Sequence, residues 1–144
     1  MSQINIKYYH KIYMSHFTNM KTSFQNLFYL EKALNKLNIQ NHRIQQTLNN
    51  NKSIINNHNL LINQSNGHNI EFCWNGEEYE LIVDISFWEQ SCPVETFIDK
   101  IGQQYASEVI IGESQKMGFE LIKYNKNSDG SNSLVLQRWS ENKN

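Results

Sequence analysis

The chain has 144 residues, a formal net charge of -1 and a sequence pI near 6.5. This length suits one domain, and the lack of a basic excess argues against binding to nucleic acid or to an anionic membrane surface. The apolar runs are far shorter than the roughly 20 residues of a membrane helix, so no membrane insertion is expected. Cys73 and Cys92 make no disulfide framework, and a reducing compartment is the simplest assumption.

The first half of the chain predicts a strand and a helix. Residues 1–13 are expected to be an N-terminal extension, either a short leading strand or a disordered segment. Alternation of side chains from Met14 to Lys21 predicts a strand. One helical stripe follows, with Ser23 or Asn26 as its N-cap and Asn38 as its stop; its apolar members are Leu27, Leu30, Leu34 and Leu37.

The segment from Asn38 to Asn69 carries 11 Asn residues and only scattered apolar positions. We interpret it as one or two short strands, around His42–Leu48 and His58–Asn63, joined by polar turns. A long loop is the alternative interpretation, because isolated apolar residues give no clear period.

The clearest pattern is a β-hairpin that begins at Ile70. Asn75-Gly76 predicts a type I′ turn, which needs a positive φ at both central residues. On the returning strand, Tyr79, Leu81, Val83 and Ile85 share one face, and Glu78, Glu80, Ile82 and Asp84 share the other. This alternation predicts a strand that is buried on one face and solvated on the acidic one.

A long amphipathic helix is expected to begin at Pro93 and to run to about Lys116, ending at Gly118. A second hairpin then turns at Asp129-Gly130. The predicted fold class is therefore α+β, with one mostly antiparallel sheet and both helices packed on one face. We expect a single domain over residues 14–140, followed by a tail over residues 141–144.

No residue set predicts catalysis, a metal or a cofactor. The His and Cys residues lack the spacing of a zinc site. Cys92 precedes a helix start, where a thiol pKa can fall, but no partner base is identifiable, so we take it as structural. Glu78, Glu80 and Asp84 share a strand face as paired catalytic carboxylates would, and a solvated face is the interpretation we favour.

Phe87, Trp88 and Glu89 form an aromatic and acidic tip between the second hairpin strand and the long helix. A large aromatic beside an acid in a loop is typical of a partner-binding hot spot. It equally suits a lid over one end of the core, and the usual burial of large aromatics favours the lid. His16 on the first strand would join Phe87, Trp88 and Glu89 in the partner-binding surface.

As a set, these motifs resemble one known family. "MSHFTNMKT", "WNGEEYELIVDISFWEQ", "ETFIDKIGQQYA", "GFELI" and "LVLQRW" are similar to the conserved hypothetical chloroplast reading frame number thirty-five family, over Met14 to Ser140. Members of that family usually begin at the position of Met14, and the segment Gln40–Asn69 matches poorly. The resemblance implies the chloroplast stroma, or the cytoplasm of a cyanobacterium, and carries no catalytic residues.

We therefore expect a soluble plastid accessory protein that binds an unknown plastid protein without catalysis. The alternative is a small-ligand binder or enzyme that uses a pocket between sheet and helices, with His16, Asp84 or Glu89 as its polar groups. A deep apolar pocket would favour the alternative, and an exposed aromatic patch would favour partner binding.

Overall fold

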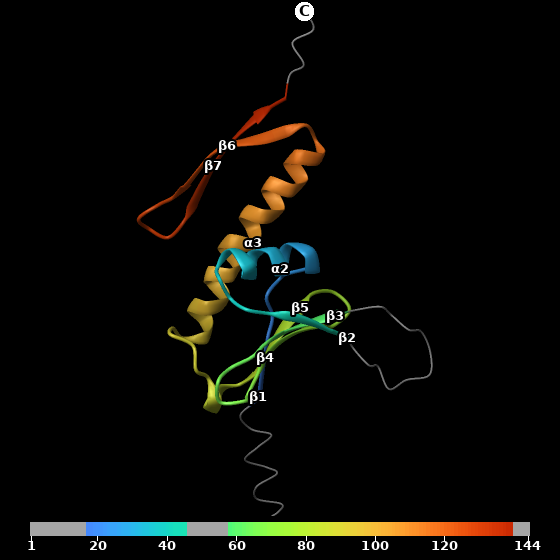
Figure 1. Cartoon of the computed structure of the whole chain (residues 1–144), viewed down its shortest axis with the longest axis vertical. Helices are drawn as coiled ribbons and strands as arrows, with labels where there is room; N and C mark the ends of the chain where they lie inside the picture. The colour runs from blue at the N-terminus through green and yellow to red at the C-terminus, as the bar shows by residue number, and fades with distance from the viewer. Residues whose placement is uncertain (1–16, 46–57, 140–144) are drawn as a thin grey trace, which may run out of the picture.

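The structure, a computed structural model, describes residues 17–45 and 58–139. It contains two helices, one short 3-10 helix and strands in two separate sheets over these residues (Figure 1). In chain order the elements are β1 (Phe17–Met20), α2 (Leu27–Lys36), β2 (His42–Gln45), β3 (His58–Ile62), β4 (Ile70–Trp74), β5 (Tyr79–Asp84), η1 (Ile85–Phe87), α3 (Val94–Lys116), β6 (Phe119–Lys126) and β7 (Asn132–Arg138).

The larger sheet has the strand order β1-β5-β4-β3-β2, and every neighbouring pair is antiparallel. This confirms the mostly antiparallel α+β class. Strands β2 and β3 come from the Asn-rich segment, so the prediction of strands there is confirmed for the described residues. Residues 1–16, 46–57 and 140–144, which include His16 and the predicted extension and tail, lie outside the described residues.

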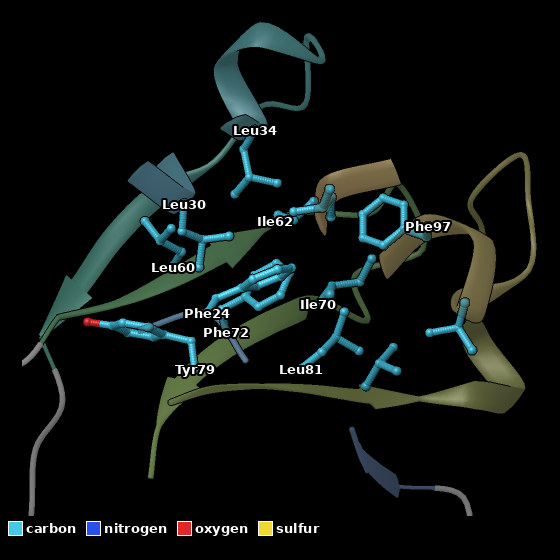
Figure 2. Packing of buried hydrophobic residues seen from close by; sticks show 13 residues of the cluster. Phe24, Leu30, Leu34, Leu60, Ile62, Ile70, Phe72, Tyr79, Leu81 and Phe97 are labelled. Carbon is cyan, nitrogen blue, oxygen red and sulfur yellow. The ribbon is translucent and has the colours of Figure 1, made fainter. Parts of the chain in front are cut away.

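The core lies between one face of this sheet and both helices (Figure 2). Leu30 and Leu34 from α2 and Phe97 from α3 point toward the sheet. The sheet side consists of Leu60, Ile62, Ile70, Phe72, Tyr79, Leu81 and Val83, all less than one-tenth exposed. Since burying one such side chain contributes about 1.5–3 kcal/mol, this cluster is the main stabilising feature of the sheet and the two helices.

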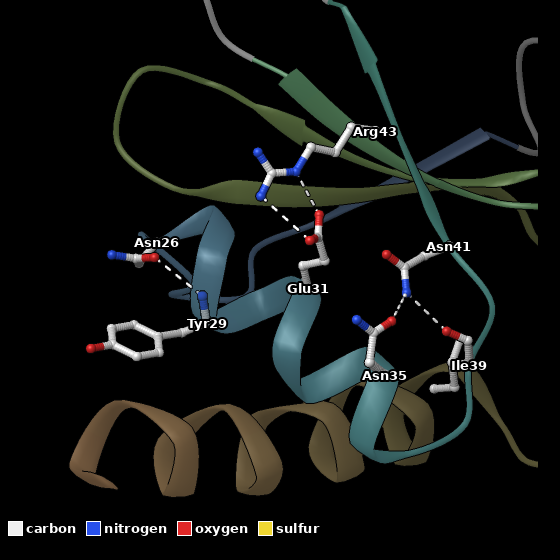
Figure 3. Close-up of polar contacts among 7 residues, drawn as sticks. All are labelled: Asn26, Tyr29, Glu31, Asn35, Ile39, Asn41 and Arg43. Carbon is white, nitrogen blue, oxygen red and sulfur yellow. Dashed lines mark hydrogen bonds and ion pairs between the residues drawn. The ribbon is translucent and has the colours of Figure 1, made fainter. Parts of the chain in front are cut away.

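Helix α2 begins and ends as its caps predict. The Asn26 side chain accepts a hydrogen bond from the Tyr29 amide at 3.2 Å, so Asn26 is the N-cap (Figure 3). Asn38 has a φ of +57°, and the Ile39 amide donates to the Leu34 carbonyl at 2.9 Å. That left-handed residue and backward bond form a Schellman ending.

Contacts from α2 also fix the start of β2. The Arg43 guanidinium donates to the Glu31 carboxylate at 2.6 Å. The side-chain nitrogen of Asn41 donates to the side-chain oxygen of Asn35 at 3.0 Å (Figure 3). Both acceptors lie on α2. The edge strand of the sheet is therefore held to the helix that covers it.

The prediction of a single sheet is wrong, because β6 and β7 form a separate two-stranded sheet. Helix α3 has 23 residues and is thus about 34 Å long, at 1.5 Å per residue. Its buried apolar positions, Val94, Phe97 and Ile101, all lie in its first half. The chain has left the core where β6 begins, so the hairpin packs on the second half of α3 instead (Figure 1).

The prediction of the first hairpin is confirmed, but the prediction that its turn is of type I′ is wrong. Gly76 has a φ of +106°, whereas Asn75 has no positive φ. The Asn75 side-chain oxygen instead accepts the amides of Glu77 and Glu78, each at 2.9 Å. This Asx-type hydrogen bonding takes over the role of the expected backbone bond.

Candidate functional site: the junction between β5 and α3

The predicted aromatic tip forms a tight junction of η1 and the residues up to Pro93. Asp84, the last residue of β5, caps η1: its carboxylate accepts the Ser86 amide at 3.1 Å and the Ser86 hydroxyl at 2.6 Å. Asp84 is only 4% exposed. The prediction that it belongs to a solvated acidic face is therefore wrong, since the cap turns its carboxylate toward the 3-10 helix.

The other two carboxylates of that strand face have separate structural partners. Glu78 accepts the Ser23 amide at 2.9 Å, and Glu80 accepts the Asn75 side-chain amide at 2.9 Å. A catalytic pair needs two carboxylates directed at one substrate. Glu78, Glu80 and Asp84 thus each support a different local turn.

Trp88 packs inward. Its indole N–H donates to the Cys92 carbonyl at 2.7 Å, and its ring meets Phe97 edge-on at a centroid distance of 5.1 Å. The side chain is half-buried against the core cluster. This geometry favours the lid interpretation for Trp88.

Phe87 points outward and remains 37% exposed. Its ring stacks flat on the His68 imidazole, with a centroid distance of 3.6 Å and an interplanar angle of 2°. The Phe87 carbonyl accepts hydrogen bonds from the side chains of Gln64 at 3.1 Å and Asn66 at 2.8 Å. An exposed ring is therefore held in one position by the loop between β3 and β4.

Gln64 is the residue that organises this junction, and no motif or periodicity in the sequence points to it. It is 7% exposed, and its amide nitrogen donates to the carbonyls of His68 and Phe87. Its amide oxygen accepts from the Glu89 amide at 2.8 Å and from the Gln90 side chain at 3.2 Å. Both polar ends of a buried amide are thus satisfied.

Glu89 is exposed and accepts a hydrogen bond from the Ser65 hydroxyl at 2.6 Å. Two further apolar side chains border the tip: Ile85 is 41% exposed, and Phe17, which is 51% exposed, pairs with Asp84 across the β1–β5 ladder. Of the predicted partner-binding residues, the structure brings Phe87, Trp88 and Glu89 together. His16 lies outside the described residues.

No group of three or more His, Cys, Asp or Glu residues that could hold a metal occurs in residues 17–45 and 58–139. Cys73 and Cys92 are both free and half-buried. None of the helices in this described part is long and apolar enough to cross a membrane.

Comparison with known proteins identifies the family. Residues 33–135 match the family described as a protein of unknown function, DUF1257. The chain belongs to this family. It is 62% identical to the uncharacterized protein ycf35 of Trieres chinensis over 85% of this chain and 97% of that protein.

Two other ycf35 proteins show the same relationship at lower identity. The chain is 40% identical to the one of Cyanophora paradoxa and 38% identical to the one of Pyropia yezoensis, in each case over 88% of this chain and at least 98% of the relative. The predicted family is thereby confirmed, and these chloroplast reading frames imply a plastid protein. No solved structure matches the chain.

Proposed function

We propose that this DUF1257 protein is an accessory protein of the chloroplast stroma that binds another plastid protein through its β5–α3 junction. The proposed contact surface, which we call the junction surface, consists of Ile85, Phe87 and Glu89. One observation carries the proposal: Phe87 is exposed although its carbonyl, its ring and the next residues are all held by the β3–β4 loop. A rigid exposed aromatic loses little entropy on binding.

The surroundings of Phe87 support the same function. Ile85 in the same 3-10 helix and Phe17, the ladder partner of Asp84, are also exposed apolar residues of this region, while Glu89, Ser65 and Asn66 make a polar border. Exposed apolar groups with a polar rim are typical of protein-binding surfaces. His16 directly precedes Phe17 in the sequence and stays a predicted member of this surface.

The test is capture of partners from a plastid extract by the tagged full-length protein, at low and at high salt. We expect one stoichiometric protein to be retained at both, because apolar contacts are insensitive to screening. The Ile85→Ser/Phe87→Ser variant should lose it. Ile110→Ser is the matched control: Ile110 is 46% exposed but lies about 24 Å along α3 from its start.

Retention of the same protein by the Ile85→Ser/Phe87→Ser variant, or the absence of any stoichiometric partner, would contradict the proposal. Thermal melts of all three proteins should agree closely, because exposed side chains contribute little to stability. If the melting temperature of the double variant is much lower than that of the wild type, its fold is impaired. The single variants Ile85→Ser and Phe87→Ser are then used in its place.

Substitutions of Trp88 test whether this residue covers the core as a lid or belongs to the contact surface. We expect Trp88→Ala to lower the free energy of unfolding by roughly 2 kcal/mol, less than a fully buried Trp would cost, because the ring is half-buried against Phe97. Trp88→Phe should recover part of this loss. Denaturant titration measures both, and a melt of Trp88→Ala that equals the wild type would show that Trp88 is no lid.

A further inference from the structure

A groove of about 320 Å³ lies where four segments meet: the end of α2, the junction, the first half of α3 and the β6–β7 hairpin. Its volume is at the lower end of the roughly 300–1,000 Å³ of small-molecule sites. Asp84 and Glu89, the polar residues expected for a ligand pocket, do not line it. The groove is therefore distinct from the pocket that the sequence suggested and from the junction surface.

The charges of the groove have one sign. Lys100 of α3 and Lys126 of β6 line it, and no carboxylate does. Neither lysine forms an ion pair with an acidic group of the described residues. In a chain whose net charge is -1, two unpaired lysines at one concave site favour an anionic occupant.

Asn132, the first residue of β7, also lines the groove. Its side-chain nitrogen donates to the Ser107 hydroxyl at 3.1 Å. Its side-chain oxygen is buried and has no hydrogen-bond partner in the described part of the chain. A buried acceptor without a donor is unfavourable, so a rotation of this side chain toward the groove would let a ligand hydroxyl or N–H group supply the missing donor.

The rest of the lining is mixed, with the polar residues Gln90, Ser91, Gln103 and Gln104 beside several apolar side chains. Leu37 and Ile39, which directly follow α2, and Phe97 of α3 line the groove, and all three belong to or pack against the core. These three side chains provide contact area for a hydrocarbon or aromatic part of a ligand.

We propose that this groove binds a small organic anion, a carboxylate or a phosphate ester. Lys100 and Lys126 hold its charged group, Leu37, Ile39 and Phe97 contact its apolar part, and Asn132 accepts a hydrogen bond from it. Lys126 and Asn132 belong to the hairpin, so the site is complete only while the hairpin packs on α3. Binding therefore stabilises that packing.

The test is a titration of the full-length protein followed by two-dimensional NMR. The carboxylate probe is 4-hydroxyphenylacetate, the phosphate probe is phenyl phosphate, and the neutral control is 2-(4-hydroxyphenyl)ethanol. We expect saturable shifts at the amides of Lys100, Lys126 and Asn132 with an acid probe, with Kd values of about 1–10 mM for fragments of this size. The neutral control should bind at least about tenfold more weakly, because two charge contacts are lost.

Variants assign the binding to the groove. Lys100→Gln and Lys126→Gln should each weaken the acid probe by about threefold, the effect of one partly exposed charge pair. Lys123→Gln is the matched control, since Lys123 is an exposed lysine of the same strand that does not line the groove. Lys123→Gln should leave the affinity for the acid probe unchanged. A separate ligand comparison tests the hydrogen bond to Asn132: phenylacetate, which lacks the hydroxyl donor, should bind more weakly than 4-hydroxyphenylacetate.

Phenylacetate and phenyl phosphate both lack the hydroxyl donor, so a comparison of these two acids shows whether a carboxylate or a phosphate is preferred. The proposal is overturned if neither acid probe gives saturable shifts by about 100 mM, roughly tenfold above the largest Kd expected for a fragment. It is equally overturned if the neutral control binds as well as the acids, or if Lys100→Gln and Lys126→Gln bind like the wild type. Loss of protein partners in the Phe87 variants has no bearing on these outcomes, so the two proposals fail separately.

Discussion

At the scale of single residues, the contact between Tyr29 and Gly112 decides how closely the two helices approach. Tyr29 is 5% exposed, and its hydroxyl donates to Glu113 at 2.9 Å. A Cβ atom at Gly112 would lie 2.5 Å from Cε1 and 2.7 Å from Cζ of the Tyr29 ring. Such separations are far below van der Waals contact, so only glycine fits at this point of α3.

We predict that Gly112→Ala lowers the free energy of unfolding by about 1–3 kcal/mol through overpacking. Gly102→Ala in the same helix is the matched control, because its Cβ would meet Phe24 at an ordinary 3.8 Å. That change should stabilise by up to about 1 kcal/mol, from helix propensity alone. Denaturant titration of both variants is the measurement, and equal effects of the two would contradict the role of Tyr29.

Cys73 provides a second test at this scale. Burial and the neighbouring Glu71 and Glu80 raise the pKa of the Cys73 thiol. Since the thiolate is the reactive form, we predict that iodoacetamide at pH 8 alkylates Cys73 at least about tenfold more slowly in the folded protein than in denaturant. Peptide mass spectrometry measures the rate, and alkylation at the unfolded rate would show that the thiol is not buried in solution.

At the scale of elements, the β4–β5 hairpin depends on the backbone of Gly76. Its φ of +106° is unfavourable for any side chain, although a Cβ atom would contact nothing within 4 Å. We predict that Gly76→Val costs about 1 kcal/mol or more, from backbone strain. Glu77→Val, at the exposed next position with no positive φ, is the control, and an unchanged melting temperature of Gly76→Val would contradict the turn geometry.

The β6–β7 hairpin is an element with few buried contacts. None of its residues is fully buried, and Ile122 and Val135 are each about half exposed. The positions of α3 beyond Tyr105 that are buried are the polar residues Ser107, Glu108 and Ser114. A two-stranded sheet of this kind is marginal by itself, so its stability depends on α3.

At the scale of the whole molecule, the described residues form a core region around the five-stranded sheet and a separate β6–β7 hairpin that contributes no residue to the buried core cluster. We predict that backbone amides of β6 and β7 exchange with deuterium at least about 100-fold faster than those of β4 and β5, which adjoin the buried core. Hydrogen exchange read by NMR measures this difference. Equal protection of both sheets would show that the hairpin unfolds only together with the core.

The predicted anion site links these two regions. Because Lys126 and Asn132 line the groove together with Leu37 and Phe97, a ligand there bridges the hairpin and the core. The exchange of hairpin amides should therefore slow when the acid probe saturates the groove. The neutral probe should leave that exchange unchanged.

Features whose causes lie within a few residues can be predicted from local sequence patterns. Local backbone preferences and side-chain periodicity set the stripe from Leu27 to Leu37, the left-handed Asn38 and the positions of the two hairpins. The same reasoning leaves Ser23 and Asn26 both as candidate caps, and the structure selects Asn26. Local preferences also set α3, where a proline precedes the first turn and Gly118 follows the last. The Asn-rich segment carried weaker periodicity, but its two short strands were still recognisable.

The other features depend on which distant segments of the chain meet, so local patterns do not reveal them. Local pattern does not show that α3 is too long for its sheet, which is why β6 and β7 form a sheet of their own. Local pattern also does not show that Asp84 turns inward as a cap. Nor does it show that the side chain of Gln64, from the β3–β4 loop, forms a hydrogen bond with the backbone of Glu89 at the junction. The groove of Lys100, Lys126 and Asn132 likewise exists only because the hairpin folds back on α3 and places residues far apart in sequence around one cavity.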